Sequence, residues 1–260
     1  MRLFALQESE GHGQRIAAAL STELSELEHR SFGDGEFKIR PLLPVAGADV
    51  CVIQSLFDGP DLTVHDKLCR LLFLIATMHD HGATRVSALV PYLPYGRKDR
   101  RTKPQDPLST RYLAQLFGGV GCDDIITLEA HNAAAFQNAF RIRTHHLDLG
   151  RVLRKTIGWS SENNPLVVMS PDPGGVKRAQ LFREALQTHL GQEVGFGFMA
   201  KRRSAGVMTR GEVVGDYDGK TVVIVDDMIA SGETMVGAAA AAKAQGASKV
   251  QALAAHGLFM

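Results

Sequence analysis

The sequence has few cysteines, almost no net charge and no long apolar run. Its three cysteines, Cys51, Cys69 and Cys122, are widely spaced and form no CxxC pair, which argues against a disulfide framework or a zinc site. Twenty-nine Lys and Arg residues balance 28 Asp and Glu residues, so the chain lacks a strong field for nucleic acid or anionic membranes. A signal peptide and an apolar run of about eighteen residues are also missing. These absences predict a cytoplasmic protein without nucleic-acid or membrane partners.

The pattern of apolar residues indicates a globular α/β protein. With 45% hydrophobic residues, the 260-residue chain can bury one large core or two ordinary ones. Short runs rich in Val, Ile and Leu alternate with longer segments of helical spacing, as in parallel strands joined by crossover helices. Strands are expected at residues 2–6, 50–54, 86–90, 124–128, 166–169, 194–198, 221–225 and 249–253. Helices are expected at residues 62–81, 108–117, 176–188 and 233–245.

Eight strands are too many for one small sheet, and the sequence therefore predicts two domains. A break near residues 145–148 gives an N-terminal domain at 1–146 and a C-terminal domain at 147–260. In the second domain LVVMS leads into PDPGG, and TVVIVDD leads into MIASGET. Each segment places a polar, glycine-containing loop at the carboxyl end of a strand, where ligands of open α/β sheets bind. The alternative is that glycine and proline make ordinary turns.

The segment VVIVDDMIASGETM carries the strongest chemical pattern. Its strand ends on two adjacent carboxylates, which are costly unless they meet hydroxyl groups or a cation. Backbone N–H groups of the following turn, with the Ser231 and Thr234 hydroxyls, can surround a phosphate at a helix N-terminus. This arrangement suits vicinal ribose hydroxyls and a 5-phosphate, while simple helix capping is the alternative. The candidate ribose-phosphate residues of this segment are Asp226, Asp227, Ser231, Gly232, Glu233 and Thr234.

This segment resembles the phosphoribosyl-binding signature shared by type I phosphoribosyltransferases and ribose-phosphate diphosphokinases. Four further segments are similar to the diphosphokinases rather than to ordinary transferases: SFGDGEFKIRPL, PYLPYGRKDRRTKPQDPLS, LEAHNAAAFQNAF and MSPDPGGVKRA. The resemblance extends from about Phe32 to Met260. It implies two stacked phosphoribosyltransferase-like domains, the second carrying the ribose-phosphate loop. The activity so implied is transfer of the diphosphate of ATP to the 1-hydroxyl of ribose 5-phosphate, giving phosphoribosyl pyrophosphate and AMP.

Through this resemblance, three segments of the N-terminal domain acquire nucleotide-binding roles. Phe32 would stack on adenine from a turn that reaches into a neighbouring subunit's site, which implies a homo-oligomer with the nucleotide site at a subunit interface. The cations of YGRKDRR follow a strand and would meet the triphosphate. The alternative for the Phe32 segment is a surface turn between two strands. The alternatives for the other two segments are a solvated basic loop and a structural histidine. The nucleotide-binding residues so implied are Phe32, Asp34, Glu36, Arg97, Lys98, Asp99 and His131.

Magnesium is the cofactor that the resemblance implies. It assigns His131 and Asp172 to the metal, and Mg²⁺ suits such a site because it keeps several waters and takes few protein ligands besides phosphate oxygens. Asp172 is also expected to contact ribose 5-phosphate. Beside it, Gly174 and Gly175 are expected to leave room for pyrophosphate oxygens.

A small-residue stretch near MAKRRSAGVM resembles the mobile catalytic loop of the diphosphokinases. Displacement at the β-phosphorus accumulates charge on the equatorial and leaving oxygens. A closing loop can neutralise this charge and exclude water. Lys201 and Arg203 are the catalytic residues that the resemblance implies.

The sequence departs from the family pattern at several points. Glu129 and Ala230 stand where Asp is usual, and Glu233 adds a carboxylate to the phosphate loop, which requires its side chain to point outward. The chain ends at AAHGLFM, where family members continue, so a shortened natural protein and a piece of a longer one both fit. Two other functions remain open: a non-catalytic regulatory homologue that binds phosphates, and a phosphoribosyltransferase that consumes phosphoribosyl pyrophosphate.

Overall fold

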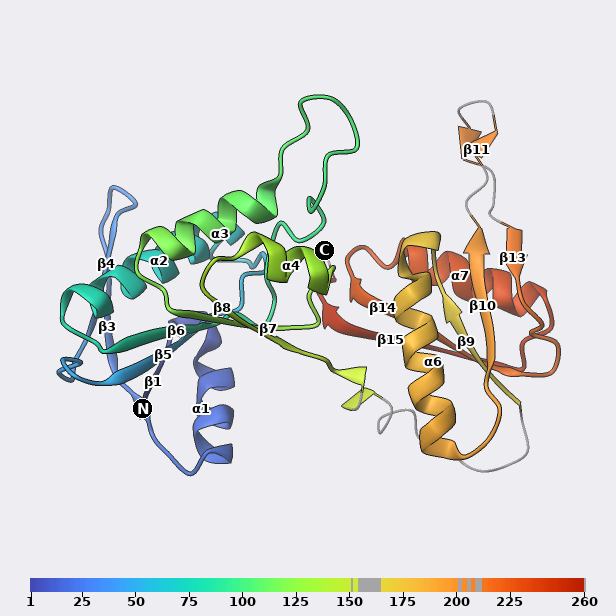
Figure 1. Cartoon of the computed structure of the whole chain (residues 1–260), viewed down its shortest axis with the longest axis horizontal. Coiled ribbons are helices and arrows are strands. Elements are labelled where there is room, and N and C mark those ends of the chain that lie inside the picture. Colours follow the sequence, from blue (N-terminus) through green and yellow to red (C-terminus); the bar gives the residue numbers. More distant parts are fainter. Residues whose placement is uncertain (151, 154–164, 201–202, 205–206, 209–211, 260) are drawn as a thin grey trace. The chain divides into compact units, whose positions relative to one another are not determined.

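A computed structural model describes residues 1–150, 152–153, 165–200, 203–204, 207–208 and 212–259. The chain divides into two compact units, Met1–Leu147 and Asp148–Met260, and each has its own sheet and core (Figure 1). Within the described residues, no helix combines the length and apolar character that crossing a membrane requires. The expected α/β class is confirmed.

A parallel six-stranded sheet forms the centre of the first unit, in the order β2-β1-β5-β6-β7-β8. Its strands are β1 (Arg2–Ala5), β2 (Leu24–Ser25), β5 (Asp49–Ile53), β6 (Arg85–Leu89), β7 (Asp124–Leu128) and β8 (Arg143–Leu147). Because the strands are parallel, their carboxyl ends meet at one edge of the sheet. The loops after the neighbouring strands β6 and β7 therefore leave the sheet side by side.

Helices cover both faces of this sheet. They are α1 (Glu10–Ala19), α2 (Val64–Asp80), α3 (Ser109–Gly119) and α4 (Ala133–Ala139), with a short 3-10 turn η1 (Gln7–Ser9) before α1. Figure 1 shows α2, α3 and α4 on one face and α1 on the other. The larger core lies under α2 and α3, where Leu71, Ile75 and Phe117 pack on Val52 and Val86. Thr63 begins α2 with a capping box, because its hydroxyl and the Asp66 carboxylate exchange hydrogen bonds with each other's backbone N–H groups.

A hairpin stands apart from the main sheet, formed by β3 (Leu27–Ser31) and antiparallel β4 (Phe37–Pro41). Phe37 packs against Phe73 of α2 with ring centroids 5.6 Å apart, which fixes the hairpin on that helix. We predicted a turn at Gly33 and Gly35, with strands on either side only as the alternative interpretation. The alternation of Phe37 and buried Ile39 with exposed, charged residues between and after them was the signal for a half-buried strand.

The second unit contains a five-stranded sheet in the order β13-β10-β9-β14-β15, parallel except for β13. Its strands are β9 (Leu166–Ser170), β10 (Gly195–Ala200), β13 (Glu212–Val214), β14 (Thr221–Ile229) and β15 (Lys249–Gly257). Two short strands, β11 (Arg203–Ser204) and β12 (Val207–Met208), pair separately. Helices α6 (Val176–Leu190) and α7 (Glu233–Ala244) pack on opposite faces, because alternate β14 residues contribute to two different cores. A 3-10 turn, η2 (Pro173–Gly175), precedes α6.

The structure corrects the end of one predicted strand. Near the break predicted at 145–148, β8 runs to Leu147 and pairs with β7, and the first unit ends at the same residue. The strand expected at 221–225 continues to Ile229, since its pairing with β15 extends as far as Gly257. Asp226 and Asp227 consequently lie inside β14 rather than just beyond it.

A buried carboxylate ties three strands together at the amino end of the first sheet. Asp124 is 1% exposed and lies 2.6 and 2.7 Å from Nε and Nη2 of Arg85, with Arg143 and His145 each about 3.0 Å away. The Arg85 guanidinium holds the pKa of Asp124 well below its usual range, although burial opposes this. The cluster connects β6, β7 and β8.

Replacing Asp124 by Asn should lower the free energy of unfolding by about 1 to 3 kcal/mol at pH 7, because hydrogen bonds to a charged group are lost. The folded pKa lies below the unfolded one, so this stabilisation is complete above about pH 4 and disappears as the pH falls through the folded pKa. Urea unfolding at pH 7 and in acid measures both effects, with the exposed Asp58→Asn as the control. Equal stability of wild type and Asp124→Asn at pH 7 would contradict the prediction.

Candidate functional site

Two adjacent aspartates and an arginine form a charged cluster toward the carboxyl end of the second sheet. Nη1 of Arg178, in the first turn of α6, lies 2.9 Å from Asp226 Oδ1 and 3.2 Å from Asp227 Oδ1. Asp226 Oδ1 also accepts the backbone N–H of Asp227 at 2.8 Å. Arg178 and Asp226 side chains are each 19% exposed, whereas that of Asp227 is 2% exposed. The cluster is therefore reachable from solvent through Asp226.

Asp226 does not behave as an ordinary carboxyl group. Burial, and then the neighbouring carboxylate of Asp227, raise its pKa to about 7, while Arg178 acts in the opposite direction. The single positive charge of Arg178 therefore does not compensate both carboxylates when both are ionised. A ligand that brings hydroxyl donors or a cation would supply this compensation.

The raised pKa gives a test of the cluster in the unliganded protein. The folded pKa of about 7 exceeds the ordinary value of 3.8, so between these pH values the folded state holds a proton that the unfolded state has released. Wild type should accordingly lose stability relative to Asp226→Asn as the pH rises from about 4 to about 7, by roughly 1 kcal/mol per pH unit, and no further above that. Denaturant titrations of both proteins across this range measure the difference. If the difference in unfolding free energy between wild type and Asp226→Asn does not change with pH, the pKa of Asp226 is not raised and the prediction is wrong.

The loop expected to hold phosphate connects β14 to α7. Gly232, with φ of +84°, is the residue before the helix, and Glu233 is the first helical residue. Ser231, Glu233 and Thr234 are exposed, so the Glu233 carboxylate is directed to solvent and not into the core. The N–H groups of a first helical turn have no intrahelical acceptors and suit an anion.

Asp172 organises the neighbouring loop after β9. Its Oδ1 accepts the backbone N–H groups of Gly174 and Gly175 at 2.8 and 3.1 Å. A Cβ on Gly175 would lie 2.8 Å from Ser170 Oγ, so no larger residue fits there without displacement. The same point lies 3.9 Å from both Asp172 Oδ1 and Arg178 Nη1. The N–H groups of the two glycines thus hold the Asp172 carboxylate within its own loop.

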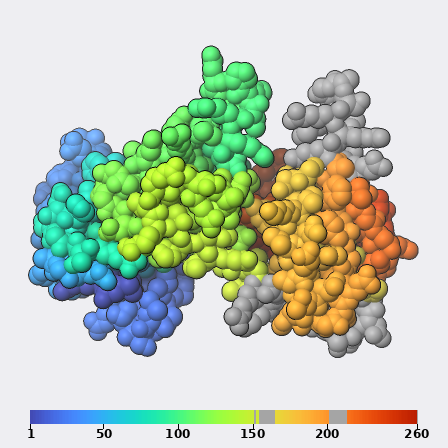
Figure 2. Space-filling model, viewed as in Figure 1, coloured from blue at the N-terminus to red at the C-terminus, as the bar shows by residue number. Residues whose placement is uncertain are grey.

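In the first unit, the expected triphosphate residues lie on a loop between β6 and α3. The loop projects from the body of this unit (Figures 1 and 2), and Arg97 and Lys98 are exposed. Its far part is tied internally, because the Asp106 carboxylate accepts both the hydroxyl and the N–H of Thr102. The basic side chains are thus presented on an ordered turn.

His131 follows β7, the neighbour of β6, and its side chain is exposed. A Cβ on Gly96 would lie 3.3 Å from His131 Cβ, which places the loops after β6 and β7 in close contact. Tyr95 and Glu129 have φ of +62° and +40° in these same loops. Strained backbone of this kind gathers at functional sites. His131, Arg97 and Lys98 therefore belong to one region of the first unit.

The remaining predicted nucleotide residues, Phe32, Asp34 and Glu36, lie at the exposed tip of the β3–β4 hairpin. Within the hairpin, the Arg30 guanidinium lies 4.9 Å from the Phe32 ring centroid. Asp34 Oδ1 accepts the N–H of Glu36 at 3.1 Å and shapes the turn. An exposed aromatic ring beside a cation is a suitable surface for stacking a base.

Other expected residues lie in separate parts of the chain. Lys201 lies outside the described residues, as does the side chain of Arg203. His131 and Asp172, the expected metal ligands, belong to different units. Among the residues that the structure describes, no group of three or more His, Cys, Asp or Glu side chains is arranged to hold a metal. A metal at either residue would need ligands from substrate or water.

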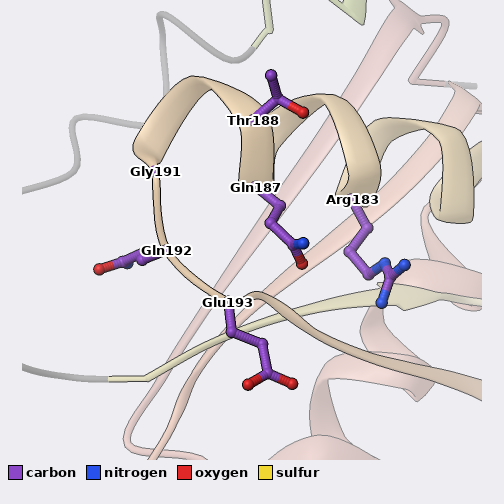
Figure 3. Close-up of a pocket in the computed structure, with 6 residues that line it drawn as sticks. All are labelled: Arg183, Gln187, Thr188, Gly191, Gln192 and Glu193. Atoms are coloured by element: carbon purple, nitrogen blue, oxygen red, sulfur yellow. The ribbon is translucent and has the colours of Figure 1, made fainter.

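A hollow of about 600 Å³ opens at the far end of α6 (Figure 3). It is lined by Arg183, Gln187, Thr188, Gly191, Gln192 and Glu193. In Figure 3 the Thr188 and Gln192 side chains point away from the other labelled side chains, so the polar groups do not converge. None of the expected site residues lines this hollow.

Sequence reasoning missed three residues of these clusters. Arg178 follows the PDPGG loop by one helical turn, a spacing that could have indicated it. Thr110 lies in the first turn of α3, and its hydroxyl lies 2.9 Å from Tyr95 O. Asn132 directly follows His131 and donates to Asp99 at 2.6 Å. The last two contacts join residues 15 and 33 positions apart, so no local pattern reveals them.

Comparison with known proteins gives a consistent picture across the chain. Residues 1–121 match the N-terminal domain of ribose phosphate pyrophosphokinase, and residues 144–256 match the phosphoribosyl transferase domain. Ribose-phosphate pyrophosphokinase of Ureaplasma parvum is 34% identical over 259 residues, covering 99% of this chain and 75% of that protein. The protein of the same name from Chlorobaculum tepidum is 36% identical over 244 residues, covering 94% and 72%.

A solved structure agrees with these sequence matches. The crystal structure of phosphoribosylpyrophosphate synthetase from Mycobacterium smegmatis has a TM-score of 0.89 to this chain at 30% identity, and covers all of this chain and 82% of that one. The family expected from the sequence segments is thereby confirmed. The chain belongs to the ribose-phosphate pyrophosphokinase family and is an enzyme of that family.

Proposed function

We propose that this family member transfers the diphosphate of ATP to the 1-hydroxyl of ribose 5-phosphate, giving phosphoribosyl pyrophosphate and AMP. The observation that carries the proposal is the acidic pair Asp226 and Asp227, which shares the guanidinium of Arg178. Burial and the Asp227 carboxylate raise the pKa of Asp226 to about 7. Such a pair gains from a ligand that supplies hydroxyl groups and a cation. Ribose 5-phosphate with magnesium is a ligand of this kind.

The sugar phosphate would bind in the second unit. Asp226 and Asp227 would accept the ribose hydroxyls, while the 5-phosphate would meet the loop before α7. Ser231 and Thr234 contribute exposed hydroxyls there, and the first turn of the helix contributes N–H groups. Arg178 limits the repulsion between the two carboxylates and a phosphate.

The nucleotide would bind the first unit, with help from a second copy of the chain. Arg97 and Lys98 would contact the triphosphate and His131 would lie beside it, which is supported by the contact between their two loops. Phe32, with Asp34 and Glu36, would reach into the site of the neighbouring copy. The exposure of all three side chains at a hairpin tip supports this role.

Magnesium fits the residues present. His131 offers a ligand atom in the first unit and Asp172 offers one in the second, and Mg²⁺ commonly completes its shell with phosphate oxygens and water. Bound there, it would neutralise negative charge on the phosphates.

The chemistry is an in-line displacement. The 1-hydroxyl oxygen forms a bond to the β-phosphorus, the bond from that phosphorus to the oxygen shared with the α-phosphate breaks, and AMP leaves with that oxygen. The hydroxyl proton passes to solvent. Lys201 and Arg203 would stabilise the charge that develops, so that positioning and electrostatics carry the rate.

Purified chain mixed with ATP, ribose 5-phosphate and Mg²⁺ should produce AMP and phosphoribosyl pyrophosphate in equal amounts. Omission of ribose 5-phosphate or addition of a chelator should stop AMP formation. Binding of both substrates without turnover would favour the regulatory homologue. Consumption of phosphoribosyl pyrophosphate only when a nucleobase is added would favour the phosphoribosyltransferase. Either result would replace the proposal.

A further inference from the structure

Asn132 connects the two loops of the first unit that carry the nucleotide residues. Its Nδ2 donates to Asp99 Oδ2 at 2.6 Å, across a separation of 33 residues in sequence. The loops also touch where Gly96 meets His131. Two contacts at different points fix both the distance and the orientation between the loops.

Asn132 also caps the helix α4, which begins directly after it. Its Oδ1 accepts the N–H of Ala135 at 3.2 Å, so the residue is the N-cap of α4. Because one end of the amide caps the helix, the other end is held toward Asp99. A helix start thereby becomes a fixed support for the basic loop.

Asp99 is directed inward although four cationic residues surround it in sequence. Its side chain is 9% exposed, whereas that of Arg100, whose Nε lies 3.8 Å from Asp99 Oδ1, is 79% exposed. A carboxylate with a 2.6 Å bond to an amide and little exposure is placed to hold the loop. Arg97 and Lys98, the two residues before it, face solvent.

The base of the loop is fixed independently. The Thr110 hydroxyl is 2.9 Å from Tyr95 O and 3.3 Å from Lys98 O, and the Lys98 N–H donates to Tyr95 O at 3.1 Å. Tyr95, with its φ of +62°, bends the chain at this point. Thr110 thus supports one end of residues 95–99, and Asn132 supports the other.

We propose that Asn132 and Asp99 are a positioning pair, which holds Arg97 and Lys98 in register with His131 for the nucleotide. This inference rests on the proposed function. It assigns Asp99 to the support of the loop and not to contact with nucleotide. Position 132 therefore needs a side chain with two hydrogen-bonding groups. One must donate to the Asp99 carboxylate, and the other must accept the N–H of Ala135 at the start of α4.

Three variants separate these requirements. Asn132→Ser keeps a good N-cap but is too short to reach Asp99. Asn132→Asp also keeps the cap, and it places a second carboxylate against Asp99. The double variant Asp99→Asn with Asn132→Asp exchanges donor and acceptor and restores the bond. Thr110→Val, which removes the hydroxyl at the loop base, is the positive control.

Two measurements are made on each variant: amide hydrogen exchange of residues 95–100 without ligand, and ATP affinity by calorimetry. Asn132→Ser should raise exchange and weaken ATP binding by about tenfold, as expected for losing a hydrogen bond to a charged group. Asn132→Asp should weaken ATP binding further. The ATP affinity of the double variant should return to within about threefold of wild type. Turnover at saturating ATP should change less than affinity.

If Asn132→Ser and Asn132→Asp both leave the amide hydrogen exchange of residues 95–100 unchanged, Asn132 does not position the loop and the proposal is wrong. A double variant that recovers loop protection but not ATP affinity would also overturn the proposal, because Asp99 would then act directly on the nucleotide. The exchange measurement uses unliganded protein and does not depend on the proposed reaction. If wild type binds no ATP, the proposed function fails, while exchange still decides whether Asn132 holds the loop.

Discussion

Replacing both Asp226 and Asp227 by Asn should weaken the binding of ribose 5-phosphate by at least tenfold. Asn keeps the shape of each side chain but removes the charge that accepts the ribose hydroxyls. Hydrogen bonds to charged groups contribute about 1.5 to 3 kcal/mol each, and about 1.4 kcal/mol corresponds to a factor of ten in affinity. Calorimetric titration of the sugar phosphate, in the presence of Mg²⁺, measures the loss.

Two controls make this result specific. Asp216→Asn removes an exposed carboxylate of the same unit, which pairs with Lys220 at 2.7 Å, and should leave sugar binding unchanged. ATP affinity of the Asp226 and Asp227 variant should change far less than sugar affinity. Normal sugar binding in a folded double variant would place the ligand elsewhere.

Changing Lys201 or Arg203 to Ala should reduce turnover by roughly a hundredfold or more, with much smaller loss of nucleotide affinity. A group that meets charge only as it develops in the transition state lowers the barrier without contributing to ground-state binding. Steady-state rates at saturating substrates, together with equilibrium ATP binding, separate the two effects.

Arg202→Ala is the matched control because it removes a neighbouring cation from the same segment. Its turnover should remain within a few fold of wild type. A near-normal rate in both the Lys201 and Arg203 variants would remove them from the catalytic machinery. A parallel loss of ATP affinity and rate would instead make them binding residues.

The main strands and crossover helices were predictable because each carries its own periodic signal. The runs at β5, β6 and β7 are mainly apolar, with buried residues in each, and α2 has an apolar stripe with a capping box at its start. The weak strands β2, β3 and β8 were missed, because their sequences contain many polar residues and their pairing partners lie elsewhere in the chain. Their formation depends on those partners.

The sequence alone determined the α/β class, the family resemblance and the loops after the strands, since residue type, spacing and periodicity are local properties. Tertiary structure decided the environment of these residues. It brought Arg178 to the acidic pair and raised the Asp226 pKa through burial. It also joined Asn132 to Asp99. Burial and pairing between distant residues depend on how strands assemble in space, so no local pattern in the chain records them.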